Sequence, residues 1–188
     1  RCLSRGLGDV YKRQVLGTIP FKGQILTEIA NFWFEKTKDI VPNHIISSPD
    51  PQVLIAKKAK TLPVEIIIRQ YITGSLWREY SDGINGHYGF DIEDGLKQNQ
   101  KFDQCIITPS TKAEYGQHDE PISREKIISE LVPEDIYSKA EDYALKLFKA
   151  GQEWADKMGL ILVDTKYEFG MYNGCLLYTS PSPRDKHR

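Results

Sequence analysis

Cysteine is scarce in this chain of 188 residues. Its three cysteines, Cys2, Cys105 and Cys175, lack metal-ligand spacing, which argues against a disulfide scaffold and for a reducing compartment. The formal net charge is only -1, so the composition gives no indication of bulk binding to nucleic acid or membrane surfaces. No apolar run approaches the roughly 18 residues of a membrane span, and the basic N-terminus has no apolar signal-peptide core. These absences predict a cytoplasmic protein of one domain or two small ones, without nucleic-acid or membrane partners.

The two ends of the chain carry related coding sequences. One DNA segment encodes residues 4–14 (SRGLGDVYKRQ), and its reverse complement, read in another frame, encodes residues 175–184 (CLLYTSPSPR). Inverted copies of one sequence around an insert are what a transposon-end sequencing adaptor leaves behind. We therefore predict that residues 1–14 and 175–188 are adaptor-derived and that the native chain is truncated at both ends.

Residues 63–80 (PVEIIIRQYITGSLWREY) combine an apolar strand pattern with charged residues that would not suit a hydrophobic core. If residues 64–71 are extended, Glu65 and Arg69 share one face of the strand. A turn follows that permits tight backbone geometry and a capped short helix, and it consists of Thr73, Gly74 and Ser75. An arginine beside a helix N-terminus suits a phosphate or carboxylate, although an ordinary Arg69–Glu65 ion pair and a plain turn explain the same residues.

A second polar stretch, TPSTKAEYGQHDE, follows a predicted strand at residues 105–108. Ser110, Thr111 and Lys112 could bind an anion together, but a turn in which Asp119 caps the next segment is an equal alternative. A zinc site is not expected, because His118 has no histidine or cysteine companions.

The third stretch is LILVDTKYEFG at residues 160–170. Its first four residues predict a buried strand, after which Asp164, Lys166 and Glu168 alternate and would point the same way from an extended backbone. Two carboxylates that flank a lysine could bind a divalent cation and a transferring phosphoryl group. An exposed strand with a face of mixed charge is the structural alternative.

Helical spacing of apolar residues predicts three helices, at about residues 24–38, from Ser123, and from Pro133 to Gly159. Aromatic and aliphatic stripes on the first and last of these helices are predicted to be core. They include Ile25, Leu26, Ile29, Phe32, Trp33, Trp154 and Met158.

In this order, PVEIIIRQYITGS, TPSTKAEYGQHDE and LVDTKYEFG resemble the motifs of the phosphoribosylaminoimidazole-succinocarboxamide synthases, the SAICAR synthetase family of purine biosynthesis. The resemblance covers residues 15 to about 170. It implies an α+β, two-lobed fold akin to ATP-grasp enzymes and protein kinases, truncated at both ends. Residues 15–60 would be the remnant of the N-terminal nucleotide-binding lobe and hinge, and residues 61–174 the lobe that binds substrate and ATP.

The resemblance implies an acid–amino-acid ligase with ATP and Mg²⁺ as cofactors. Such an enzyme joins L-aspartate to the carboxylate of the imidazole nucleotide CAIR and gives SAICAR, ADP and phosphate through a phosphorylated carboxylate. CAIR, L-aspartate and ATP would be its small-molecule partners, and no oligomeric state is implied. The alternatives are a kinase-like phosphotransferase and a non-catalytic nucleotide-binding module. The truncation predicts that this chain itself is inactive.

The resemblance also implies roles for individual residues. The imidazole nucleotide would be held by Arg69, Thr73, Gly74 and Ser75. The same cleft or the aspartate pocket would be lined by Lys112, His118 and Asp119. The catalytic pair would be Asp164, near the reacting carboxylate, and Lys166, which would also face the triphosphate with the magnesium ligand Glu168.

Overall fold

Strand β4 (Val64–Tyr71) is the central strand of the main sheet. The computed structural model describes residues 19–84, 86–112 and 119–179. Within them β4 pairs antiparallel with β5 (Lys101–Ile107) and β6 (Ser110–Thr111) along one edge and with β7 (Asp164–Tyr167) along the other. A strand with neighbours on both edges and cover on one face becomes largely buried, and six of the eight residues of β4 are buried.

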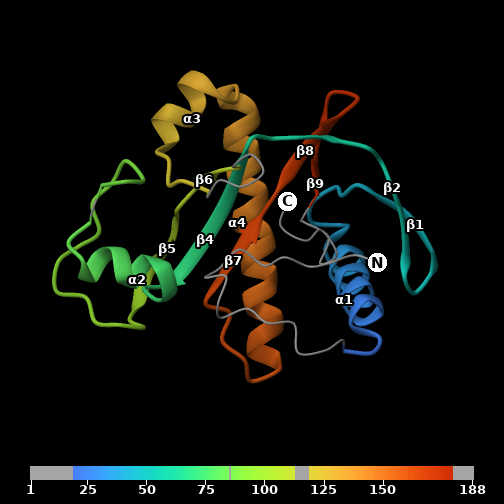
Figure 1. Cartoon of the computed structure of the whole chain (residues 1–188), viewed down its shortest axis with the longest axis horizontal. Coiled ribbons are helices and arrows are strands. Elements are labelled where there is room, and N and C mark those ends of the chain that lie inside the picture. Colours follow the sequence, from blue (N-terminus) through green and yellow to red (C-terminus); the bar gives the residue numbers. More distant parts are fainter. Residues whose placement is uncertain (1–18, 85, 113–118, 180–188) are drawn as a thin grey trace, which may run out of the picture.

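The long helix α4 (Glu134–Lys157) packs against this sheet, and Figure 1 shows it running behind β4 and β7. The helix begins after Pro133 with two acidic residues in its first turn, as the sequence predicts. Ala140 and Ala144 are fully buried, and their small side chains let the helix approach the sheet closely. The core between them is formed by Ile66, Ile68, Tyr137, Ala140, Ala144, Leu147 and Phe148.

The predicted cap of α3 (Arg124–Glu130) is confirmed, because the Ser123 side chain accepts a hydrogen bond from the Lys126 backbone N–H. Beyond the end of β4, α2 (Gly74–Ser81) packs with the segment that follows it around a small separate core. That core consists of Ile72, Leu76 and Tyr88. Figure 1 places α2 at the opposite side of the sheet from α1 (Lys22–Thr37) and the hairpin of β1 (Ile45–Asp50) and β2 (Val53–Ala56).

A second sheet consists of β3 (Lys60–Thr61), β8 (Phe169–Tyr172) and β9 (Cys175–Tyr178), in the order β3-β8-β9. The β8–β9 turn places Asn173 and Gly174 at positive φ, which glycine adopts readily. Strand β9 buries Leu176 and Leu177, although it lies in residues 175–188. This packing does not bear on the origin of the coding sequence, so the adaptor assignment stays a prediction.

The structure corrects two predictions about apolar segments. The stripe on α1 is not core: Ile25 is 51% exposed and Ile29 49%, because α1 buries its other side through Thr27, Phe34 and Thr37. The strand predicted at residues 160–163 is absent, since β7 begins at Asp164, where pairing with β4 starts, and Leu160 and Ile161 are exposed. Met158 is exposed as well. None of the described helices is long and apolar enough to cross a membrane.

Candidate functional site

One face of the β4–β7 pair carries the polar residues that the sequence singles out. Glu65, Ile67 and Arg69 alternate along β4, and the antiparallel register places Asp164 opposite Arg69 and Lys166 opposite Ile67. Alternate residues of a strand point to the same face, so these five side chains share one surface. The predicted common direction of Asp164 and Lys166 is therefore confirmed.

Arg69 is held rigidly at one end of this face, with only 7% of its surface exposed. Its Nε donates a hydrogen bond to Thr108 Oγ1 at 2.9 Å, its Nη1 to Asp164 Oδ2 at 3.2 Å and its Nη2 to Ser75 Oγ at 3.3 Å. The guanidinium thus joins β4 to the residue after β5, to the start of β7 and to the first turn of α2. A planar fork fixed in this way is preorganised for an oxyanion beside it.

The three residues of the turn after β4 differ in what they contribute to the site. Gly74 has φ +62°, a conformation that favours glycine. The helix cap position is Thr73 rather than Ser75, and its side chain makes no cap hydrogen bond but donates to Asn99 Oδ1 at 2.7 Å. Ser75 instead accepts the hydrogen bond from Arg69. The structure therefore joins Ser75 to the Arg69 cluster, whereas the Thr73 side chain is turned toward Asn99.

A network of charges occupies the other end of the face. The Lys166 ammonium forms an ion pair with Glu65 Oε2 and a second one with Asp119 Oδ2 at 3.5 Å. Lys112 Nζ lies 2.5 Å from Glu168 Oε2. Glu65 also interacts with the Glu168 side chain, so these contacts bring the predicted residues Lys112, Asp119, Lys166 and Glu168 into one cluster. His118 lies outside the described residues.

Glu65 is a member of this network that the motif comparison did not assign. It is only 4% exposed, and its Oε2 also accepts a hydrogen bond from Ser110 Oγ at 3.4 Å. Burial raises the pKa of Glu65 to about 7; Lys166 opposes the shift and the adjacent Glu168 adds to it. Burial lowers the pKa of Lys166, but the Glu65 and Asp119 carboxylates outweigh it, so the Lys166 pKa lies above its usual value.

The Arg69–Glu65 ion pair considered as a structural alternative is wrong. Within the described residues Arg69 forms its ion pair with Asp164, and Glu65 pairs with Lys166. The signal that could have identified Glu65 is its alternation with Arg69, which shows that the two share a face. The sequence did not reveal that β7 would supply the partner of each.

The Glu168 carboxylate suits an Mg²⁺ ion that is also coordinated by a phosphate ligand. No group of three or more His, Cys, Asp or Glu side chains among the described residues is arranged to hold a metal by itself. Magnesium in phosphoryl-transfer sites commonly takes one or two carboxylates and completes its shell with water and substrate phosphates. The Glu168 carboxylate matches that requirement, and Lys112 already orients it.

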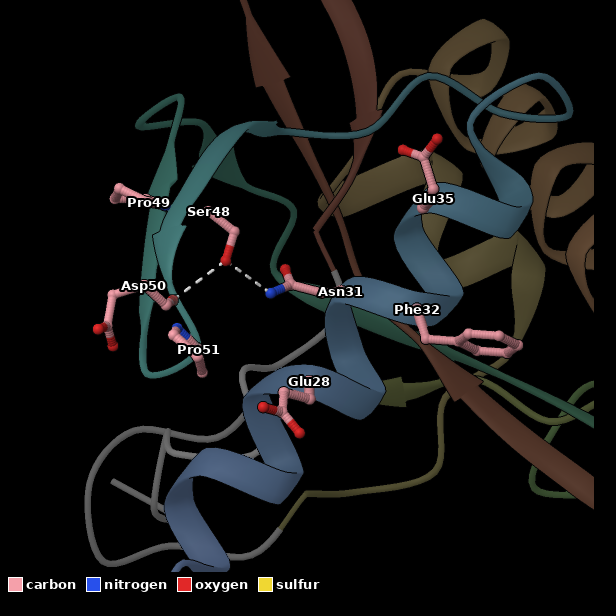
Figure 2. Close-up of a pocket in the computed structure, with 8 residues that line it drawn as sticks. All are labelled: Glu28, Asn31, Phe32, Glu35, Ser48, Pro49, Asp50 and Pro51. Carbon is pink, nitrogen blue, oxygen red and sulfur yellow. Dashed lines mark hydrogen bonds between the residues drawn. The ribbon is translucent and has the colours of Figure 1, made fainter.

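A cavity of about 460 Å³ lies elsewhere, between α1 and the β1–β2 hairpin. In Figure 2 the Asn31 amide reaches across from α1 and donates to Ser48 Oγ at 2.9 Å. The charged lining residues of the cavity, Glu28, Glu35 and Asp50, are all acidic, and the rest of the lining includes Phe32, Pro49 and Pro51. It shares no residue with the β4–β7 face and offers no cation to a phosphate, so it is not the candidate site.

Comparisons with known proteins show which family the sequence is similar to. A family model described as SAICAR synthetase matches residues 9–179. A putative phosphoribosylaminoimidazole-succinocarboxamide synthase 2 of Agrobacterium fabrum is 48% identical over 162 residues, which are 84% of this chain and 51% of that protein. The phosphoribosylaminoimidazole-succinocarboxamide synthase of Bacteroides fragilis is 48% identical over 159 residues, with the same two coverages.

Solved structures are similar as well. The SAICAR synthase of Saccharomyces cerevisiae complexed with SAICAR has a TM-score of 0.77 and 32% identity, with 92% of this chain and 63% of that chain covered. This likeness confirms the predicted α+β fold class. The chain spans about half the length of the curated relatives it matches.

Proposed function

Because the chain belongs to the SAICAR synthetase family, we propose that its β4–β7 face serves an ATP-dependent ligase that joins L-aspartate to the carboxylate of CAIR. The products of this reaction are SAICAR, ADP and phosphate. The observation that carries the proposal is the buried Arg69 guanidinium, fixed toward Asp164 and Ser75 on the face that also holds Lys166 and Glu168.

The chemistry explains why such a face is needed. A carboxylate resists attack by an amine because its oxygen is a poor leaving group. Transfer of the terminal phosphoryl group of ATP to that oxygen releases ADP and leaves an acyl phosphate on the imidazole nucleotide. The aspartate nitrogen then forms the C–N bond as phosphate departs, and the amine loses its proton. Every reactant is an anion, so fixed cations are required to bring them together.

We assign a role in this reaction to each residue from its position on the face. Arg69 and Ser75, with Gly74 in the turn, bind an anionic group of CAIR at one end of the face, and Thr73 supports the turn from its bond to Asn99. Asp164 lies opposite Arg69 at the same end of the face, where it contacts the reacting carboxylate. Lys166 turns its ammonium toward the triphosphate, and Lys112 and Asp119 lie beside it at the same end of the face; the family resemblance adds His118 to their role.

Magnesium would supply charge neutralisation between the phosphates, and Glu168 is the residue that would hold it. Its side chain is largely buried and oriented by Lys112, so the carboxylate does not have to reorganise on binding. The chain's own contribution is therefore a buried carboxylate oxygen that is oriented by a neighbouring ammonium.

Aspartate dependence separates this proposal from its alternatives. We would express the uninterrupted protein. By this we mean the complete product of the natural gene in which the codons for residues 15–174 occur. ADP release would be followed with CAIR and Mg²⁺, with and without L-aspartate, beside the present chain. Turnover that requires aspartate supports the ligase. Equal turnover without aspartate would favour a kinase-like phosphotransferase, and nucleotide binding without turnover would favour a non-catalytic module.

A further inference from the structure

Glu65 is a buried carboxyl group in the middle of a site whose proposed ligands are all anionic. Its carboxylate lies on the central strand with 4% of the residue exposed. Burial of a carboxylate is costly unless the group is paired and hydrogen-bonded, and a buried ion pair is often no more stable than an apolar replacement. Stability alone is therefore a weak reason for this residue.

The contacts of Glu65 are directed at one functional group. Glu65 lies two residues from Ile67, the strand partner of Lys166, so the lysine side chain runs diagonally across the sheet to reach it. The Ser110 hydroxyl, supplied by β6 on the opposite edge of β4, fixes the carboxylate from the far side. The carboxylate is thus anchored in the sheet and faces the ammonium.

The two partners of Lys166 differ in what they can fix. Asp119 is exposed, and its Oδ2 lies 3.5 Å from the ammonium, so it forms a loose outer contact. Glu65 is buried in the sheet and forms the close contact. An ammonium on a four-carbon stem is flexible, and only the buried partner restricts where it can lie.

We propose that Glu65 is a positioning residue that fixes the Lys166 ammonium at the floor of the β4–β7 face. It acts through Lys166 and holds that ammonium where a transferring phosphoryl group is stabilised. The inference rests on the proposed function for its kinetic consequence, whereas the Glu65–Lys166 contact itself can be tested without turnover.

The test compares Glu65→Gln with Glu65→Asp and with Glu141→Gln. Glu141 is a matched control, because its partly buried carboxylate also pairs with a cation, Arg124 Nε at 3.1 Å, away from the face. In the uninterrupted protein, Glu65→Gln should lower kcat about a hundredfold, the scale of a misplaced catalytic group, with KM for CAIR changed less than about threefold. Glu65→Asp should recover part of kcat, and Glu141→Gln should stay within about twofold of the parent.

The second readout is covalent labelling of Lys166 by an amine-reactive reagent, mapped by mass spectrometry against Lys139 as an internal reference. In Glu65→Gln the labelling of Lys166 should rise several-fold, because the ammonium is no longer held to a buried carboxylate. This holds in the present chain and in the uninterrupted protein, so it survives failure of the proposed reaction.

Several outcomes would overturn the inference. Unchanged Lys166 labelling in a folded Glu65→Gln variant would show that Glu65 does not fix the ammonium. A raised Mg²⁺ requirement with unchanged labelling would make Glu65 a metal ligand instead. If Glu65→Gln does not fold by circular dichroism, Glu65→Asp decides, and normal kcat together with normal Lys166 labelling in that variant would refute the positioning role.

Discussion

Replacement of Arg69 by lysine tests the candidate site most directly. Lysine keeps the charge but cannot reproduce the fork, so the ammonium can satisfy only part of the set formed by Thr108, Asp164 and Ser75. Thr108 is fully buried and would lose its charged donor. We expect the variant to fold, but to lose the guanidinium geometry that would bind an oxyanion.

The stability cost follows from the burial of each partner. A hydrogen bond to a charged group contributes about 1.5–3 kcal/mol, and breakage of a fully buried ion pair costs about 3–5 kcal/mol. The side chain of Asp164 is 45% exposed, so water can solvate it after the change and the larger figure does not apply. We therefore expect Arg69→Lys to lower the free energy of unfolding by about 2–3 kcal/mol, which corresponds to a fall in Tm of roughly 4–12 °C.

The loss of turnover should be larger than the loss of stability alone would cause. A misplaced substrate costs about a hundredfold in rate, so Arg69→Lys in the uninterrupted protein should lose about a hundredfold in kcat/KM for CAIR in the aspartate-dependent assay. Arg124→Lys is the matched control, since Arg124 also donates to a carboxylate and a hydroxyl, of Glu141 and Ser138, but away from the face. That variant should lose stability with turnover within about twofold. Arg69→Lys with parental turnover, or an equal loss in Arg124→Lys, would refute the reasoning.

Three further predictions concern the fold. Gly170→Ala should lower the free energy of unfolding by about 1–3 kcal/mol in urea titrations, because its new Cβ would lie 3.0 Å from Ala59 Cβ and displace β3. Phe148→Ala should cost about 3–5 kcal/mol in the same measurement, since Phe148 is a fully buried core ring. Burial, aided by the Glu79 carboxylate, raises the pKa of Tyr88 to about 12 from its usual value of about 10. The folded state therefore holds the Tyr88 proton more tightly, so stability from this group declines as pH rises from about 10 to 12. Tyr88→Phe should show a shallower decline there, and an identical pH profile in the two proteins would contradict the assignment.

The sequence predicted the polar face better than it predicted the apolar surfaces. Alternation along residues 64–71 and 164–168 correctly places charged side chains on common faces, because a strand has a fixed period of two. Helical periodicity also located an apolar stripe on α1 correctly, but Ile29 of that stripe is exposed. Periodicity identifies which residues share a face, whereas burial depends on what packs against that face.

Pairing across strands is the other property that local patterns do not contain. Glu65 and Arg69 are two strand periods apart on one face, which made a mutual ion pair a reasonable alternative. Their actual partners, Lys166 and Asp164, come from a strand about a hundred residues later in the chain, and the register that aligns them is set by tertiary packing. The three motifs could be assigned to one site only through the family resemblance.

The register of β4 against β7 connects the core to the candidate site. Tyr167 is buried and pairs with Ile66 on the face that packs toward α4, while Lys166 takes the opposite face. A slip of one residue would turn Tyr167 toward the polar face and remove Lys166 from Glu65. The buried aromatic ring therefore helps to fix which side chains reach the site. For this reason a core substitution that preserves the register, such as Phe148→Ala, should reduce stability and leave Lys166 labelling at its parental level in the folded protein.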